Sequence, residues 1–158
     1  MSERVSLRPV TSEDEGFLRL VYAEGRREEL AQVAWPEGAL EAFVGQQFAA
    51  QSAHYAGNYP GAEFQVVLLD GEPVGRLYVH RGGSDIRIME IGLMPGARGR
   101  GIGTGLLQGI LDEGQATGRV VSIHVEKFNP ALRLYERLGF QIAGDRDVYW
   151  LLHRAPVS

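Results

Sequence analysis

The chain has 158 residues, a length typical of one domain, and its 44% hydrophobic and 23% charged residues are the balance of an ordinary globular protein, which argues against a disordered or fibrous class. The net charge of −4 argues against a nonspecific binder of nucleic acid or of an anionic membrane, because such binders need a clustered positive field. With no cysteine and with four histidines outside any metal-binding spacing, we expect a single domain over residues 1–158 that holds no metal.

No membrane segment or signal peptide is expected. The first ten residues, MSERVSLRPV, contain no apolar core, and no apolar run approaches the roughly 18 residues that a membrane span needs. These features predict a cytoplasmic protein.

The N-terminal third reads as one strand followed by two helices. Val5–Pro9 predicts a short strand, and a capping box at Ser12–Glu15, followed by apolar residues at helical spacing, predicts the first helix. Pro36 can open a second helix at its first position, with an end near Ser52. The turn formers and aromatic residues of His54–Gly61 predict a surface loop.

The middle of the chain predicts antiparallel strands. Phe64–Leu69 and Val74–His80 flank Asp70-Gly71, a dipeptide that suits the positive φ angles of a tight hairpin turn. Ile86–Met94 predicts a third antiparallel strand.

A crossover follows. A helix that begins near Ile102 and ends at Gly118 separates Ile86–Met94 from a strand at Val120–Val125, and this order predicts that the two strands are parallel. The remaining predicted elements are a helix over Asn129–Leu138 and strands over Phe140–Ala143 and Val148–Leu152.

Glycine is concentrated between residues 92 and 118, which hold nine of the 21 glycines where even spreading would give roughly four. The loop that precedes the helix predicts an anion site, because a helix start has unpaired N–H groups and Gly99, Gly101 and Gly103 leave them uncovered. Arg98 and Arg100 add positive charge. Further along, we expect Gly105 and Gly109 to allow close helix packing.

Two common phosphate loops do not fit this sequence. A Walker loop needs Lys and then Ser or Thr after its second glycine, whereas Gly101 is followed by Ile102 and Gly103. A Rossmann loop needs a third glycine where Leu106 stands.

The stretch Arg98–Gly103 does match R-x-x-G-x-G, and it resembles the corresponding motif of the GNAT acetyltransferase superfamily. The segment Asn129–Phe140, NPALRLYERLGF, resembles the second conserved segment of that family. The resemblance implies an α/β (α+β) fold with a central mixed, mostly antiparallel sheet of about six to seven strands and about four flanking helices.

The resemblance also implies acetyl-CoA as the cosubstrate. Its pyrophosphate would lie on the loop N–H groups, and its pantetheine arm would enter where the strands at Ile86–Met94 and Val120–Val125 splay apart. The N–H of Met94 would polarise the thioester carbonyl. The cofactor-binding residues implied are Leu93, Met94, Arg98, Gly99, Arg100, Gly101, Ile102, Gly103, Thr104, Asn129 and Tyr135.

Two of these residues have alternative roles. By the resemblance, Tyr135 lies near the sulfur and donates a proton to the departing thiolate, but it could equally be a core residue of an amphipathic helix. Asn129 precedes Pro130, so it could cap the helix, contact the cofactor, or do both.

Glu90 interrupts an apolar strand on the same face as Ile86 and Ile88. Burial of its carboxylate would raise its pKa and suit it to accept a proton from an incoming ammonium, directly or through water. The alternative is a cross-strand ion pair with an arginine, Arg76 or Arg87. Reserve candidates for a base or a water relay are Ser122 and His124.

The sequence thus predicts an N-acetyltransferase that transfers acetyl directly from acetyl-CoA to a primary amine of a small molecule or a peptide. A noncatalytic acyl-CoA-binding module and a nucleotide-binding protein are the alternatives, and the family resemblance leaves a homodimer open. Selectivity for the amine should come from acidic and aromatic residues outside the motifs, namely Glu28, Glu29, Trp35, His54, Tyr55 and Tyr59.

Overall fold

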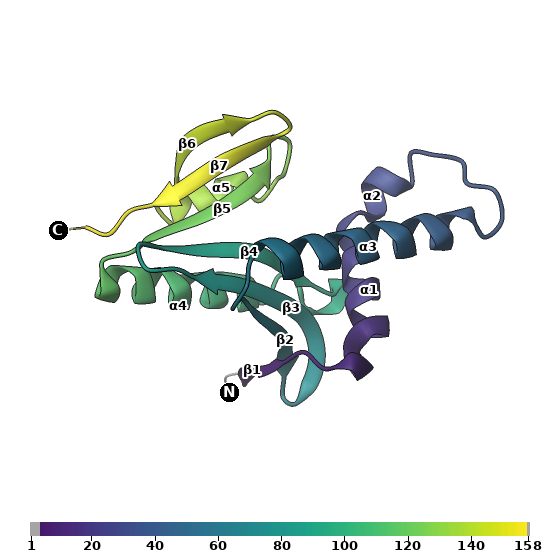
Figure 1. Cartoon of the computed structure of the whole chain (residues 1–158), viewed down its shortest axis with the longest axis horizontal. Coiled ribbons are helices and arrows are strands. Elements are labelled where there is room, and N and C mark those ends of the chain that lie inside the picture. The colour runs from purple at the N-terminus through teal and green to yellow at the C-terminus, as the bar shows by residue number, and fades with distance from the viewer. Residues whose placement is uncertain (1–3, 158) are drawn as a thin grey trace. The chain divides into compact units, whose positions relative to one another are not determined.

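The structure, a computed structural model, describes residues 4–157 (Figure 1). Within this range seven strands form one sheet in the order β1-β2-β3-β4-β5-β7-β6. The chain divides into two compact units. Unit 1 contains the residues up to Leu77 together with Ile91–Arg98, and unit 2 contains Tyr78–Glu90 together with the residues from Gly99 onward. The strands β3 and β4 each continue from one unit into the other.

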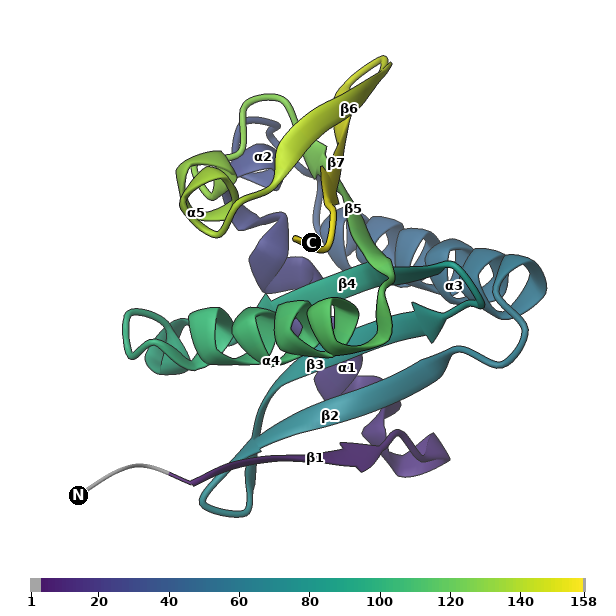
Figure 2. The ribbon, with the colours of Figure 1, turned by 90° about the vertical axis from the view of Figure 1, so that its left-hand side faces the viewer.

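Unit 1 begins with β1 (Val5–Pro9), which pairs antiparallel with β2 (Glu63–Leu69). The predicted hairpin is confirmed: β2 leads into β3 (Glu72–Arg81) through Asp70-Gly71, whose φ angles are 50° and 85°. Figure 2 shows these three strands side by side in the order of the sheet.

The helices of unit 1 are α1 (Glu15–Gly25), α2 (Arg27–Leu30) and α3 (Ala39–Asn58), and α3 packs across α1 (Figure 1). A short 3-10 turn at Ser12–Asp14 precedes α1. The buried side chains that join the helices are Leu18, Tyr22, Leu30, Val44 and Phe48. This cluster explains why the apolar stripes of the three helices face inward.

The capping box lies one residue earlier than predicted. The Asp14 carboxylate accepts the Thr11 N–H at 2.7 Å, and Arg8 donates to both of its oxygens at 2.8 Å. The hydrogen bond from Arg8 is the main reason that the pKa of Asp14 lies well below its ordinary value. A buried carboxylate therefore remains charged at this helix start, paired with a cation from β1.

The predicted limits of α3 are wrong at both ends. Pro36 forms a turn in which its carbonyl accepts the Ala39 N–H at 3.0 Å, and the helix starts only there, after Gly38 at φ 79°. At the other end α3 runs through most of the expected loop to Asn58, whose side-chain amide donates to the His54 carbonyl at 2.9 Å. The short helix α2 was not predicted.

Unit 2 contains the crossover. β4 (Asp85–Leu93) pairs parallel with β5 (Val120–Glu126), which confirms the predicted direction, and α4 (Ile102–Thr117) connects them. Gly118, at φ 68°, ends α4 as expected. The pairs run only from Asp85↔Val120 to Ile88↔Ile123.

The C-terminal strands complete unit 2. β7 (Tyr149–Arg154) pairs antiparallel with β5 on one edge and with β6 (Gln141–Arg146) on the other. Helix α5 (Leu132–Arg137) is shorter than the predicted Asn129–Leu138. None of the described helices has the length and apolarity that crossing a membrane would require.

Two glycines of unit 1 fix how closely β3 and the end of β4 approach each other. A Cβ built on Gly75 would collide with the Gly92 carbonyl oxygen and lie 2.8 Å from Leu93 Cδ2. The first of these atoms belongs to the backbone and cannot rotate away. Gly75→Ala should therefore lower the free energy of unfolding by about 3 kcal/mol, through overpacking.

Denaturant unfolding measures this loss, and Gly109→Ala is the matched control. A Cβ at Gly109 meets nothing within 4 Å inside α4, so alanine there should stabilise the protein by about 0.5–1 kcal/mol. Equal stability of Gly75→Ala and the parent protein would show that β3 and β4 are less constrained than described.

Candidate functional site

The N-terminus of α4 has the open backbone that the glycine pattern predicted. Gly99 and Gly101 have φ angles of 76° and 80°, a region that side chains disfavour. Gly101 is the N-cap residue, no side chain caps the helix, and the first helical bond runs from the Gly105 N–H to the Gly101 carbonyl at 2.9 Å. The N–H groups of Gly103 and Thr104 therefore precede the helical ladder and point out of its positive end.

The packing around the glycines of α4 differs from the prediction. A Cβ at Gly105 or Gly109 would meet nothing within 4 Å, so the expected close packing through these two residues is wrong. Close packing occurs instead at Gly114, where a Cβ would lie 2.8 Å from Val121 Cγ2. The first turns of α4 thus carry glycine where the fold does not demand it.

The residues on the β4 side of the loop are held by local bonds within unit 1. Arg98 donates its Nε to the Leu93 carbonyl at 3.0 Å, and the side chain remains exposed. The Met94 N–H donates to the Val74 carbonyl at 2.7 Å. This strand bond occupies the N–H that was expected to polarise a thioester, so we do not assign Met94 that role.

The remaining loop residues divide by exposure. Arg100 and Thr104 are exposed, whereas the Ile102 side chain is buried at 5% exposure and can offer only its backbone. Asn129 does act as a cap, because its Oδ1 accepts the Ala131 N–H at 2.8 Å.

Tyr135 and Glu90 lie close enough in unit 2 to interact electrostatically. Burial, and after it the negative charge of Glu90, raises the pKa of Tyr135 to about 12. The Tyr135 ring is buried at 7% exposure and packs edge-on against Phe140, with ring centroids 5.6 Å apart. The hydroxyl makes no hydrogen bond to any described residue. Glu90 is half-buried, less shielded than the sequence predicted.

The reserve candidates lie on the opposite face of the sheet. Arg87 and Ser122 are register partners, so their side chains share one face, whereas Glu90 alternates onto the other. Arg87 donates its Nε to Ser122 Oγ at 2.7 Å, and its Nη1 lies 3.2 Å from His124 Nδ1. Ser122 and His124 therefore cannot relay a proton from Glu90.

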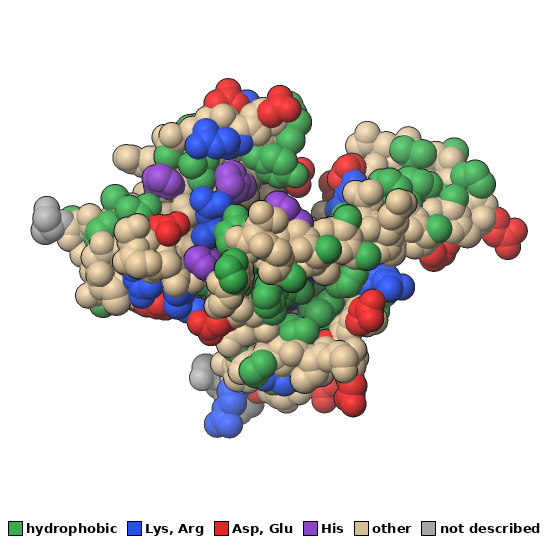
Figure 3. Space-filling view, viewed as in Figure 1, with side chains coloured by type: hydrophobic (Ala, Val, Ile, Leu, Met, Phe, Trp, Pro, Cys, Tyr) green, Lys and Arg blue, Asp and Glu red, His purple; other side chains and the backbone are tan. Residues whose placement is uncertain are grey.

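Positive charge surrounds His124. Desolvation, followed by the charges of Arg87 and Arg146, holds the pKa of His124 below its ordinary value of 6.5. Figure 3 shows blue and purple side chains gathered over β5, β6 and β7. Alternation along β4 and β5 shows which residues share a face, but grouping Arg87 with Ser122 and His124 also needs the register of the two strands. The sequence does not provide that register.

Comparison with known proteins identifies the family. The model of the Acetyltransferase (GNAT) family matches residues 26–140, which is most of the chain. The chain belongs to the GNAT acetyltransferase family. No match was found among curated proteins. Within the described residues, no group of three or more His, Asp or Glu side chains is arranged to hold a metal ion.

Solved structures of GNAT acetyltransferases share the fold. The PaiA N-acetyltransferase of Thermoplasma acidophilum, in complex with coenzyme A, is 15% identical with a TM-score of 0.72, over 96% of this chain and 99% of that one. An acetyltransferase of Thermus thermophilus is 22% identical with a TM-score of 0.69, over 96% of each chain. The ribosomal-protein-S18-alanine N-acetyltransferase of Escherichia coli is 18% identical with a TM-score of 0.61, over 97% and 93%.

The residues expected to select an acceptor for this GNAT enzyme have mixed roles. Glu29 pairs with Arg26 at 2.8 Å, which lowers the pKa of Glu29, so this carboxylate serves the local structure. Glu28 is exposed. Three aromatic rings at the end of α3 lie in series: His54 is tilted against Tyr55 with centroids 5.9 Å apart, and Tyr55 meets Tyr59 edge-on at 6.3 Å.

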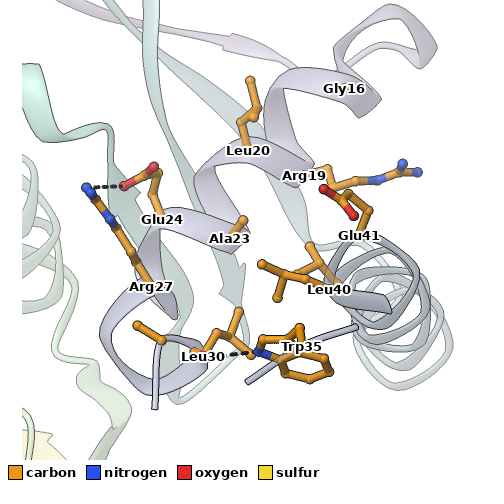
Figure 4. A pocket seen from close by; sticks show the side chains of 12 residues that line it. Gly16, Arg19, Leu20, Ala23, Glu24, Arg27, Leu30, Trp35, Leu40 and Glu41 are labelled. Atoms are coloured by element: carbon orange, nitrogen blue, oxygen red, sulfur yellow. Dashed lines mark hydrogen bonds and ion pairs between the residues drawn. The ribbon is translucent and has the colours of Figure 1, made fainter. Parts of the chain in front are cut away.

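Trp35 lines a cavity that no sequence motif predicted. The cavity, of about 460 Å³, lies wholly within unit 1 between α1, α2 and α3 (Figure 4). Its lining residues come from three helices that meet only in the folded chain. The periodicity of any one helix therefore did not predict this cavity.

His124 gives a pH prediction for unit 2. Because its folded pKa is lowered, the neutral ring favours the folded state, and the stability it contributes is complete above about pH 6.5 and is lost as the pH falls from there. Arg87→Gln should raise the pKa of His124 toward 6.5, as NMR titration of the imidazole would measure. Arg133→Gln, an exposed arginine on α5, should leave it unchanged, and an unaltered His124 titration in Arg87→Gln would contradict the assignment.

Proposed function

We propose that this enzyme transfers the acetyl group of acetyl-CoA directly to a primary amine, of a small molecule or of a peptide, with Tyr135 as the general acid and Glu90 as the base. The observation that carries the proposal is the pairing, within unit 2, of a buried protonated tyrosine with a carboxylate. Family membership supports the acetyl transfer, and two of the similar structures are N-acetyltransferases.

The loop before α4 would hold the cosubstrate. Acetyl-CoA supplies an activated thioester and a pyrophosphate, and coenzyme A is bound in the similar PaiA structure. The uncapped N–H groups at the start of α4 suit an anion, with Arg98 and Arg100 contributing charge and Gly99, Gly101 and Gly103 giving access. Backbone N–H groups of Ile102 and Thr104 would complete the cradle. Leu93, Met94 and Asn129 remain proposed contacts.

Tyr135 is suited to donate rather than to accept a proton. With a pKa of about 12 its hydroxyl is protonated at neutral pH. Full transfer to a thiolate with a pKa of about 8.5 would be unfavourable by about 5 kcal/mol. Tyr135 should therefore donate a hydrogen bond to the departing sulfur and release its proton only as a replacement arrives from the reacting amine.

Glu90 would take the other proton. An ammonium acceptor loses two protons when it becomes an amide: one ends on sulfur and one in solvent. Glu90, half-buried and near Tyr135, can accept the second proton directly or through a water molecule, which generates the neutral amine that attacks. Its negative charge also keeps Tyr135 protonated.

The proposed anion site can be tested at Gly105. Gly105→Glu places a carboxylate beside the first turn of α4, where a Cβ would meet nothing within 4 Å and the helix dipole favours negative charge, so stability should hold or rise. Binding of acetyl-CoA should weaken at least about tenfold through charge repulsion. Isothermal titration calorimetry measures the dissociation constant of acetyl-CoA.

Gly109→Glu is the matched control, since it adds the same side chain to an open position of the same helix, beyond the first turn. It should bind acetyl-CoA normally. Equal weakening by both substitutions would reject the first turn of α4 as the anion site.

The catalytic proposal can be tested at Tyr135. Tyr135→Phe keeps the ring against Phe140 and removes only the hydroxyl, so kcat should fall about 10²-fold or more while acetyl-CoA binding is retained. Release of free thiol in the presence of an amine panel gives the rate. Tyr149→Phe, on β7, should leave the rate unchanged.

Glu90→Gln separates the two roles. It should reduce kcat/KM. An undiminished rate in Tyr135→Phe would remove the acid. Acetyl-CoA binding without turnover of any amine would indicate a noncatalytic acyl-CoA-binding module.

A further inference from the structure

The cavity of unit 1 has an apolar interior. Seven of its twelve lining residues are apolar: Leu20, Ala23, Leu30, Ala31, Trp35, Leu40 and Val44. Figure 4 shows Ala23 of α1 beside Leu40 of α3, with Leu20 above them and Leu30 and Trp35 below. A volume of about 460 Å³ is within the range of small-molecule sites.

Contacts within unit 1 hold the side chains of the wall in place. Trp35 donates its indole Nε1–H to the Leu30 carbonyl at 2.8 Å, and its ring stacks on Phe43 with centroids 5.1 Å apart. Leu30 and Val44 are buried members of the core, whereas Leu20 is 57% exposed at the mouth. Binding would therefore require little ordering of side chains.

One carboxylate at the end of this cavity lacks a hydrogen bond. The Oε2 atom of Glu24 is shielded from solvent and accepts no hydrogen bond from any described residue. Its ion-pair partner, Arg27 Nη1, is 3.8 Å away, beyond hydrogen-bond distance. Because Oε2 itself is shielded, a donor on a bound molecule would reach this carboxylate through its other oxygen, Oε1.

The charges around the cavity favour a cation. The Glu24 side chain is 28% exposed, whereas the Arg27 and Arg19 side chains are 75% and 48% exposed and hydrated. Arg19 is also paired with Glu15 at 3.4 Å. The acid is the less hydrated charge, so it interacts more strongly with a ligand of opposite sign.

We propose that this cavity binds an apolar amine, a compound that joins one ammonium group to an alkyl or aryl body. The body contacts Leu20, Leu40 and Trp35, and the ammonium donates to the Glu24 carboxylate. This site lies in unit 1 and its ligand chemistry is independent of the transfer reaction proposed above.

Fluorescence of Trp35 tests the proposal without acetyl-CoA. Trp150→Phe leaves Trp35 as the sole tryptophan, and this protein is titrated with 2-phenylethylamine, 2-phenylethanol and 3-phenylpropionate. The amine should shift the emission of Trp35 and bind about tenfold or more tightly than the acid, because only the amine gives Glu24 a charge-assisted bond.

Two substitutions locate the two halves of the ligand. Glu24→Gln should weaken amine binding at least about fivefold, whereas Glu28→Gln, which removes the same charge from an exposed position outside the lining, should not. Leu20→Phe narrows the mouth at an exposed position, so it should weaken all three probes and leave the thermal unfolding midpoint near that of the parent.

The titrations decide in either direction. Preference for the acid, equal loss in Glu24→Gln and Glu28→Gln, or no binding by any probe to a folded protein would overturn the proposal. Because the readout is binding alone, failure here is distinct from failure of acetyl transfer.

Discussion

The short parallel pairing of β4 with β5 is the constraint on which the site depends. The two strands exchange bonds only between Asp85↔Val120 and Ile88↔Ile123, and β5 then continues along β7 as far as Glu126. Parallel neighbours need a crossover, so α4 must begin soon after β4 ends, and its N-terminus follows the glycine loop directly. Glu90 lies beyond the last β4–β5 pair, on a stretch of β4 that β5 does not cover. One register thus accounts for an open helix start and for a carboxylate near Tyr135.

Alternation along β4 then separates two electrostatic environments. Arg87 lies on one face, where its positive charge helps to keep His124 neutral. Glu90 lies on the other face, where its negative charge helps to keep Tyr135 protonated. In both cases desolvation is the larger cause and the strand residue adds to it, so neutral forms are favoured on both sides of the sheet. The proposed reaction needs a protonated donor, Tyr135, beside a charged carboxylate, Glu90. Because Glu90 is three residues from Arg87 on the same strand, the two side chains lie on opposite faces of the sheet.

Local signals in the sequence were sufficient for most of the fold. Asp70-Gly71 predicted a hairpin, and Gly118 predicted a helix end, because each needs a backbone angle that few residues adopt. Predictions failed where distant contacts decide. The long α3 is stabilised by packing on α1, which no window of α3 alone contains, and the Met94 N–H is occupied by a carbonyl twenty residues upstream. The cavity of unit 1 likewise exists only once three helices meet. For the site, motif residues placed the loop, but the interaction of Tyr135 with Glu90 needed the folded chain.

The glycines of α4 show how fold and function can be separated at single positions. Gly101 has a left-handed backbone and Gly114 has no room for a side chain, so the fold explains both. Gly105 has neither constraint, and it costs about 1 kcal/mol of helix stability relative to alanine. A destabilising residue that packing does not require needs another explanation, and access of an anion to the first-turn N–H groups is one. Gly109 lies beyond that turn, and nothing in the structure explains it. The glycine excess therefore has three physical origins, and only the part at the helix start supports the proposed cosubstrate site.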